Sequence, residues 1–124
     1  MRKGKLLFIC SANSQRSPTA ERLFEDWKGN WKTKSAGIMP EVGRNPLTQE
    51  LIDWADLILV MEPYHYRVIQ SEFRTNREKI RVLHIPDIYM RNDPELIGEL
   101  KRKVIPILDA WATPELGSRA YLAE

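Results

Sequence analysis

The hydrophobic residues of this chain gather in short runs, separated by stretches in which apolar positions recur every three or four residues. Runs this short are typical of buried strands rather than helices. We predict strands at residues 5–9, 31–36, 57–61 and 80–85. The third run, Leu-Ile-Leu-Val-Met, is apolar at every position, as expected for a central parallel strand that helices cover on both faces.

The first predicted helix follows the first strand after a polar stretch. Ser17 is a suitable capping residue, and Pro18 fits the first helical position, where its missing N–H costs nothing. Apolar residues then recur at helical spacing up to Trp27, with charged residues between them. Gly29-Asn30 is expected to end this helix.

Each of the other strands is also followed by a predicted helix. Thr48 is placed to cap a short one, Glu62-Pro63 begins the next, and Asp93-Pro94 begins the last. Pro106 lies within the apolar stripe of the last helix and should kink it or end it early, because proline cannot donate to the helical hydrogen-bond ladder. We expect the tail after about residue 112 to be irregular.

Strand and helix therefore alternate four times along the chain. This order predicts a parallel sheet with helices on both faces, because parallel neighbours need a crossover connection. No repeat, linker or low-complexity segment divides the 124 residues. We predict a single three-layer α/β domain over residues 1–124, with a four-stranded parallel sheet.

Composition narrows the classes of function. The 19 basic and 17 acidic residues are well mixed, and the densest basic run, residues 101–103, fits a solvated helix face better than a nucleic-acid site. No window approaches the roughly 20 apolar residues of a membrane span. One cysteine forms neither an internal disulfide nor a cysteine-rich zinc site. We expect a cytoplasmic protein that binds neither nucleic acid nor membranes, and the sequence predicts no particular oligomeric state.

The single cysteine, Cys10, lies at the end of the first predicted strand, where open α/β sheets bind their ligands. Five residues separate it from Arg16, and a helix begins directly afterwards. A loop of this length can direct successive backbone N–H groups at one point, and with the helix N-terminus these form an anion site. Arg16 adds a planar fork that binds two phosphate oxygens. We therefore predict a phosphate-binding loop after the first strand.

The same positive environment favours the thiolate form of Cys10, which is the nucleophilic form. Ser17 is a suitable hydroxyl donor to the sulfur. A nucleophile at the floor of a phosphate cradle is arranged for in-line attack at phosphorus. The competing interpretation is a buried, inert cysteine before an ordinary polar loop. The strand before Cys10 and the helix start after it favour the catalytic interpretation.

A candidate acid follows the fourth predicted strand. Asp87 is expected at the same edge of the sheet as Cys10, because the carboxyl ends of parallel strands share one edge. A general acid that protonates a departing phenolate contributes roughly 10²–10⁴-fold to the rate. Asp93 is the rival, but Pro94 follows it at a helix start, and a capping role suits it better.

The segment from Cys10 to Pro18, Cys-Ser-Ala-Asn-Ser-Gln-Arg-Ser-Pro, resembles the phosphate loop of the low-molecular-weight protein tyrosine phosphatases, C-x5-R-S-P. Further similarities follow in the order of that family, and they cover nearly the whole chain. They are Ser35-Ala36-Gly37, Val42-Gly43-Arg44, the segment from Asp56 to Met61, and Asp87-Ile88-Tyr89. The chain resembles a shortened member, because its stretch between residues 44 and 56 is much shorter than in other members.

The resemblance implies a metal-independent hydrolase without a cofactor, a protein phosphatase that acts on phosphotyrosine in a phosphorylated protein or on a small aryl phosphate. It implies that Cys10 attacks phosphorus to form a phosphocysteine and that Arg16 binds the phosphoryl oxygens. Asp87 would protonate the leaving group and then activate water. The residues implied to shape the loop or bind phosphate and substrate are Ser11, Ala12, Asn13, Ser14, Gln15, Arg16, Ser17 and Tyr89.

Three positions depart from the family's pattern. Gln15 stands where many members have a second cysteine, so no disulfide protects Cys10 from oxidation. Ile88 replaces the proline of the family's D-P-Y, and residues 38–41 hold no counterpart of the aromatic side chain that often lines the cleft. Tyr89 is left to form one aromatic wall. These departures leave phosphate chemistry intact but put a preference for phosphotyrosine in question.

Two other functions stay open. Arsenate reductases of one kind share this fold and loop, but they relay electrons through further cysteines, so Cys10 alone would require an external thiol. A phosphate- or phosphoprotein-binding module without catalysis is the other. The two histidines, His65 and His84, are too far apart for a local motif, and His84 is expected to be partly buried and hydrogen-bonded on its strand.

Overall fold

A computed structural model describes residues 3–40 and 42–112, so the predicted irregular tail lies outside the described residues. The strands form one parallel sheet in the order β2-β1-β3-β4. Their bounds are β1 Gly4–Cys10, β2 Trp31–Gly37, β3 Leu57–Val60 and β4 Ile80–Val82. The helices are α1 Arg16–Phe24, α2 Gln49–Trp54, α3 Pro63–Glu72 and α4 Pro94–Ala112, with 3-10 turns η1 Trp27–Gly29 and η2 Arg77–Lys79.

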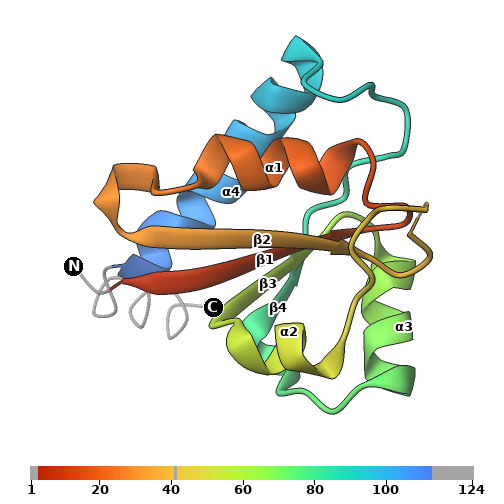
Figure 1. The fold of residues 1–124 in the computed structure, drawn as a ribbon. Helices are drawn as coiled ribbons and strands as arrows, with labels where there is room; N and C mark the ends of the chain where they lie inside the picture. Colours follow the sequence, from red (N-terminus) through yellow and green to blue (C-terminus); the bar gives the residue numbers. More distant parts are fainter. Residues whose placement is uncertain (1–2, 41, 113–124) are drawn as a thin grey trace.

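Helices cover both faces of the sheet, α1 and α4 on one and α2 and α3 on the other (Figure 1). Side chains of β1 alternate between two hydrophobic clusters. Leu6 and Phe8 belong to the cluster beneath α1 and α4, whereas Leu7 and Ile9 belong to the cluster beneath α2 and α3. All four are fully buried, as expected for a central strand in a parallel sheet. The predicted three-layer α/β fold with a four-stranded parallel sheet is confirmed.

The helix starts agree with prediction at two of three capping residues. Thr48 caps α2 by accepting a hydrogen bond from Leu51 N at 3.2 Å, and Asp93 accepts one from Glu95 N at 2.8 Å. The prediction for α1 was wrong: the helix begins at Arg16, and Ser17 lies inside its first turn. The hydroxyl of Ser17 serves the cysteine instead, as described below.

The last helix continues through Pro106, contrary to the predicted kink or early end. Pro106 lies on the exposed side of α4, while Val104 and Leu108 lie on its buried side. The carbonyl that loses its partner belongs to Arg102, which is also exposed, and water can satisfy an exposed carbonyl. The apolar stripe of the helix is therefore retained across the proline.

The fourth strand ends at Val82, earlier than predicted, because His84 has a φ of 57° and interrupts the extended backbone. His84 is exposed rather than partly buried. On both sides of His84 the backbone is still hydrogen-bonded to the end of β3: Leu83 N donates to Val60 O and Ile85 N to Met61 O, both at 2.8 Å. These contacts hold the segment that leads to Asp87 against the end of β3.

The order of the strands places a switch point at the end of β1. From β1 the chain passes to β2 on one side, and later to β3 on the other side of β1. The loop after β1 and the start of α3 therefore meet at the carboxyl edge of the sheet (Figure 1). This is where open parallel sheets bind ligands. The short segment between residues 44 and 56 contributes only α2.

Among the described residues, no helix combines the length and the apolar character that crossing a membrane requires.

Candidate active site

Cys10 ends β1 and is almost completely buried at the base of the loop. Its Sγ lies 2.9 Å from the Oγ of Ser17. Ser17 Oγ already accepts a hydrogen bond from Asn13 Nδ2 at 3.0 Å. The proton of the Ser17 hydroxyl is therefore available to the sulfur, and a donated hydrogen bond stabilises a thiolate.

Asn13 shapes the loop from within. Its φ of 55° lies in the left-handed region, which asparagine tolerates better than most residues. Its side-chain amide donates to Ser17 Oγ and Ser35 Oγ, both at 3.0 Å, and its Oδ1 accepts from Asn45 N at 3.0 Å. Three partners from three segments thus fix the turn of the loop.

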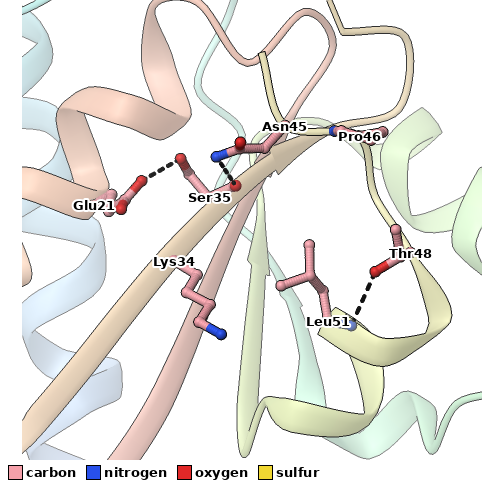
Figure 2. A pocket seen from close by; sticks show the side chains of 7 residues that line it. All are labelled: Glu21, Lys34, Ser35, Asn45, Pro46, Thr48 and Leu51. Atoms are coloured by element: carbon pink, nitrogen blue, oxygen red, sulfur yellow. Dashed lines mark hydrogen bonds between the residues drawn. The ribbon is translucent and has the colours of Figure 1, made fainter. Parts of the chain in front are cut away.

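Ser35 extends this network away from the cysteine. Its hydroxyl accepts from Asn13 and donates to a carboxylate oxygen of Glu21 (Figure 2). The main-chain oxygen of Ser35 accepts from the side-chain amide of Asn45 at 3.3 Å. Each hydroxyl or amide in this network donates to the next group, from Asn13 to Ser35 and from Ser35 to Glu21, and the Glu21 carboxylate only accepts. The loop is therefore tied to both α1 and β2.

A pocket of about 320 Å³ adjoins this network between β2 and α2 (Figure 2). Its lining residues are Glu21, Lys34, Ser35, Asn45, Pro46, Thr48 and Leu51. Neither Cys10 nor Arg16 lines it. Ser35 and Asn45 connect it to the loop through their bonds to Asn13. The pocket is therefore separate from the predicted site of phosphate chemistry.

Gly37, at the end of β2, allows the chain to pass very close to the loop. A Cβ at this position would lie 2.7 Å from Ser11 O and 2.8 Å from Asn13 N, closer than side-chain carbons approach backbone atoms. Beyond it, Met39 N donates to Ser11 O at 2.8 Å. The Ser35-Ala36-Gly37 segment therefore contributes to the loop in two ways: the Ser35 hydroxyl binds Asn13, and Gly37 leaves room for the backbone of the loop.

Arg16 opens α1 and is buried, with 1% of its side chain exposed. Its Nη1 donates to Glu62 Oε2 and to the carbonyl of Ile85, both at 2.7 Å. These two bonds use both hydrogens of Nη1. The edge of the guanidinium formed by Nε and Nη2 is the one suited to a two-point contact with phosphate.

Asp87 lies 3.8 Å from Nε of Arg16 and is 64% exposed. Hydrogen bonds on both sides of Asp87 place it: Ile85 N donates to Met61 O at the end of β3, and Asn92 N donates to the side-chain hydroxyl of Thr19 in α1 at 2.9 Å. The acid predicted from the sequence thus lies beside the predicted phosphate-binding arginine. Tyr89, predicted as an aromatic wall, is partly buried and packs against the core cluster beneath α1 and α4.

Three residues of the site were missed in the sequence. They follow β3 directly and are Glu62, Tyr64 and His65. His65 Nε2 lies 3.0 Å from Ser11 Oγ, and the Tyr64 hydroxyl is also hydrogen-bonded to Ser11. Their position after a central strand was a signal, because that strand ends at the same edge as Cys10.

His65 is fully buried, and its pKa is lowered to about 4. Burial is the main cause, and the positive charge of Arg16 adds to it, while Glu62 and Asp87 act in the opposite direction. The imidazole is therefore neutral near pH 7. A neutral ring donates from one nitrogen and accepts at the other.

Known proteins with similar sequences indicate that this chain is a phosphatase. The family model described as low molecular weight phosphotyrosine protein phosphatase matches residues 5–51. A protein-arginine-phosphatase of Bacillus subtilis strain 168 is 31% identical in an alignment of 103 positions, and the alignment covers 63% of this chain and 69% of that protein.

Solved structures share the fold. The YwlE arginine phosphatase from Geobacillus stearothermophilus superposes with a TM-score of 0.71 at 24% identity, covering 92% of this chain and 96% of that one. The low molecular weight protein tyrosine phosphatase from T. tengcongensis gives 0.70 at 22% identity over 86% and 99%. The tyrosine phosphatase Wzb from Escherichia coli K30, in complex with sulphate, gives 0.66 at 26% identity over 82% and 93%.

The chain belongs to the low molecular weight protein tyrosine phosphatase family. It is a cysteine-dependent phosphatase, a class whose members in these comparisons include both tyrosine and arginine phosphatases.

Proposed function

We propose that this protein hydrolyses phosphorylated residues of proteins through a phosphocysteine on Cys10. The thiolate attacks phosphorus as the bond to the leaving group breaks, and Asp87 gives that group its proton. Asp87 then takes a proton from water, which attacks the phosphocysteine and releases phosphate and the thiolate. Each step balances, because the proton given in the first is recovered in the second.

The arrangement of Cys10, Arg16 and Asp87 around one loop carries this proposal. Cys10 and Arg16 are both buried, and Ser17 contacts the sulfur at 2.9 Å. Asp87 is held 3.8 Å from the guanidinium yet is largely exposed, so it can reach a leaving group on the solvent side of a bound phosphate. A nucleophile, an anion clamp and an acid at one edge are what phosphoryl transfer to cysteine requires.

Arg16 is suited to act as the clamp because its Nη1 is already fixed by Glu62 and Ile85. The side edge of the guanidinium can then bind two phosphoryl oxygens without a search over side-chain conformations. Ser11, Ala12, Asn13, Ser14 and Gln15 supply the main-chain N–H groups of the cradle in this proposal.

Phosphotyrosine is the first substrate class. Two aliphatic side chains, Met39 and Ile88, are 75% and 73% exposed, and each adjoins a residue at the site. Met39 N is bonded to Ser11 O, and Ile88 follows Asp87. This apolar rim suits a residue carried on a protein chain. Tyr64, through its hydrogen bond to Ser11, supplies an aromatic ring at the loop.

Phosphoarginine is the second substrate class, and the 31% identical protein-arginine-phosphatase favours it. Here the bond that breaks is P–N, and a proton from Asp87 converts the departing guanidine to guanidinium. Glu62 and Asp87 place two carboxylates beside Arg16, which suits a cationic leaving group better than a phenolate.

The mechanism is tested with p-nitrophenyl phosphate without added metal. We expect turnover by the wild type, none by Cys10→Ser, and a greater loss in Asp87→Asn than in Asp93→Asn. Phosphate binding without turnover would instead support a binding module. Arsenate reduction with an added thiol, but no ester hydrolysis, would support a reductase. Equal damage from Asp93→Asn would remove Asp87 from its assigned role.

The substrate class is tested with two peptides of one sequence, one phosphorylated on tyrosine and one on arginine. The ratio of their kcat/KM values assigns the class. We also propose a cytoplasmic location, where a lone thiol stays reduced.

A further inference from the structure

We propose that His65 is a positioning residue that joins the two ends of the phosphate loop through a single imidazole ring. The inference rests on the proposed function of the loop and concerns how the loop is held in shape. It assigns a role to a residue outside the loop, 55 positions after Cys10 in the sequence.

The protonation of the ring follows from its partners. The main-chain N–H of Glu62 lies 3.0 Å from His65 Nδ1, and an N–H can only donate. Nδ1 must therefore be the accepting nitrogen, and the proton of the neutral ring is on Nε2. Nε2 lies 3.0 Å from Ser11 Oγ, so His65 donates to Ser11.

These two bonds lead to opposite ends of the loop. Ser11 is its first residue after Cys10. Glu62, whose main chain is held by Nδ1, directs its carboxylate to Arg16 at the other end, at 2.7 Å. His65 N also donates to Glu62 O at 3.1 Å, so Glu62 is fixed by both the main chain and the ring of His65.

Burial makes these bonds specific. The ring of His65 is fully buried, so water cannot replace either partner. A packing role alone would be served by an apolar side chain, which has no groups to satisfy. Instead both ring nitrogens are directed to groups that position the phosphate-binding elements. A small displacement of such elements lowers the rate strongly.

Two substitutions separate the two bonds. His65→Asn places an amide oxygen near the position of Nδ1, so it retains the bond to Glu62 N but does not reach Ser11. His65→Gln places an amide nitrogen near the position of Nε2, so it retains the bond to Ser11 but loses the one to Glu62 N. Each is assayed for kcat and KM, for inorganic phosphate affinity by calorimetry, and for thermal unfolding.

We expect His65→Asn to lose roughly five- to tenfold in kcat/KM and a similar factor in phosphate affinity, the effect of one net hydrogen bond. His65→Gln should bind phosphate better than His65→Asn but unfold at a lower temperature, because the start of α3 loses its partner. A packing role would instead lower the unfolding temperature of both and leave the kinetics of the folded protein unchanged.

Ser11→Ala tests the same contact without altering the core, and it decides the question if His65→Asn does not fold. The double variant Ser11→Ala/His65→Asn should lose no more than the larger single loss, because both changes remove the bond between His65 and Ser11. His84→Asn is the matched control, since His84 is exposed and its left-handed backbone suits asparagine.

Wild-type kcat/KM and phosphate affinity in both His65→Asn and Ser11→Ala would overturn the inference. Its failure is distinguishable from failure of the proposed function. A wild type that binds phosphate but does not turn over substrate refutes the function, while the phosphate affinities still report on His65. A wild type that neither binds phosphate nor turns over substrate refutes both.

Discussion

The Nη1 atom of Arg16 lies 2.7 Å from Oε2 of Glu62, although 46 residues separate them in the sequence. Arg16 is buried and Glu62 is 29% exposed, so the arginine gives up more hydration than its partner. The pair fixes the guanidinium before any substrate arrives. The Glu62 carboxylate also places a negative charge beside the position that a phosphate dianion is proposed to occupy. Glu62 therefore stabilises the fold and, at the same time, opposes anion binding.

Glu62→Gln should therefore separate stability from affinity. The unfolding free energy should fall by about 1–3 kcal/mol, because the buried guanidinium loses its charged partner. Phosphate should bind more tightly by roughly 1 kcal/mol, about fivefold, because the repulsion is removed. Urea unfolding and phosphate calorimetry measure the two effects. Glu72→Gln, an exposed change at the end of α3, is the control. Weaker phosphate binding by Glu62→Gln would contradict this account.

Asp87→Asn should affect substrates according to their leaving groups. Phenyl phosphate, with a poor leaving group, should lose roughly 10²–10⁴-fold in kcat, whereas p-nitrophenyl phosphate should lose much less. The physical reason is that nitrophenolate leaves with little help from a proton. Steady-state kinetics of the two esters measure the difference. An equal loss for both would mean that Asp87 acts by charge or position rather than as an acid.

Gly37→Ala should damage the loop from outside it. The added Cβ would meet backbone atoms at 2.7 Å and 2.8 Å, so the loop or the end of β2 must move. We expect a loss of about 1–3 kcal/mol in unfolding free energy and about 10²-fold in kcat/KM. Gly98→Ala is the matched control: its Cβ meets nothing within 4 Å, and alanine should stabilise α4 by about 0.5–1 kcal/mol. Wild-type kinetics in Gly37→Ala would show that the loop adapts without cost.

The lowered pKa of His65 predicts that acid destabilises the protein. Burial holds this pKa at about 4 in the folded protein, against the ordinary value of 6.5 for histidine. Between these values the unfolded chain binds a proton that the folded protein does not, so stability is complete above pH 6.5 and falls as pH decreases toward 4. From pH 7 to pH 5 the loss should be about 2 kcal/mol. Denaturant unfolding at pH 7, 6 and 5 measures it.

Denaturant unfolding of His65→Asn at the same three pH values isolates the contribution of the imidazole ring to the acid sensitivity. Its unfolding free energy should change less between pH 7 and 5 than that of the wild type. If His65→Asn kept the full slope, the acid sensitivity would belong to other groups.

The sequence alone was enough to predict the layers of the fold and the identity of the loop. Strands and helices were predictable because their apolar periodicity is local, and the order in which they alternate restricts the topology. The proximity of Cys10, Arg16 and Ser17 was predictable because all three lie within one short segment, between a strand and a helix. The position of Asp87 beside Arg16 required one further step, the shared edge of parallel strands.

The tertiary structure decided which distant segments come into contact and which side of each helix is exposed to solvent. Glu62 and His65 had no local signal as partners of Arg16 and Ser11, because each pair forms only when β1 and β3 lie side by side. Pro106 remains helical because its side of α4 is exposed, a fact of packing rather than of local sequence. The sequence by itself determined where the proposed nucleophile and anion cradle lie, since chain connectivity holds them together. Only the folded sheet decided which carboxylate and which imidazole hold that cradle in place.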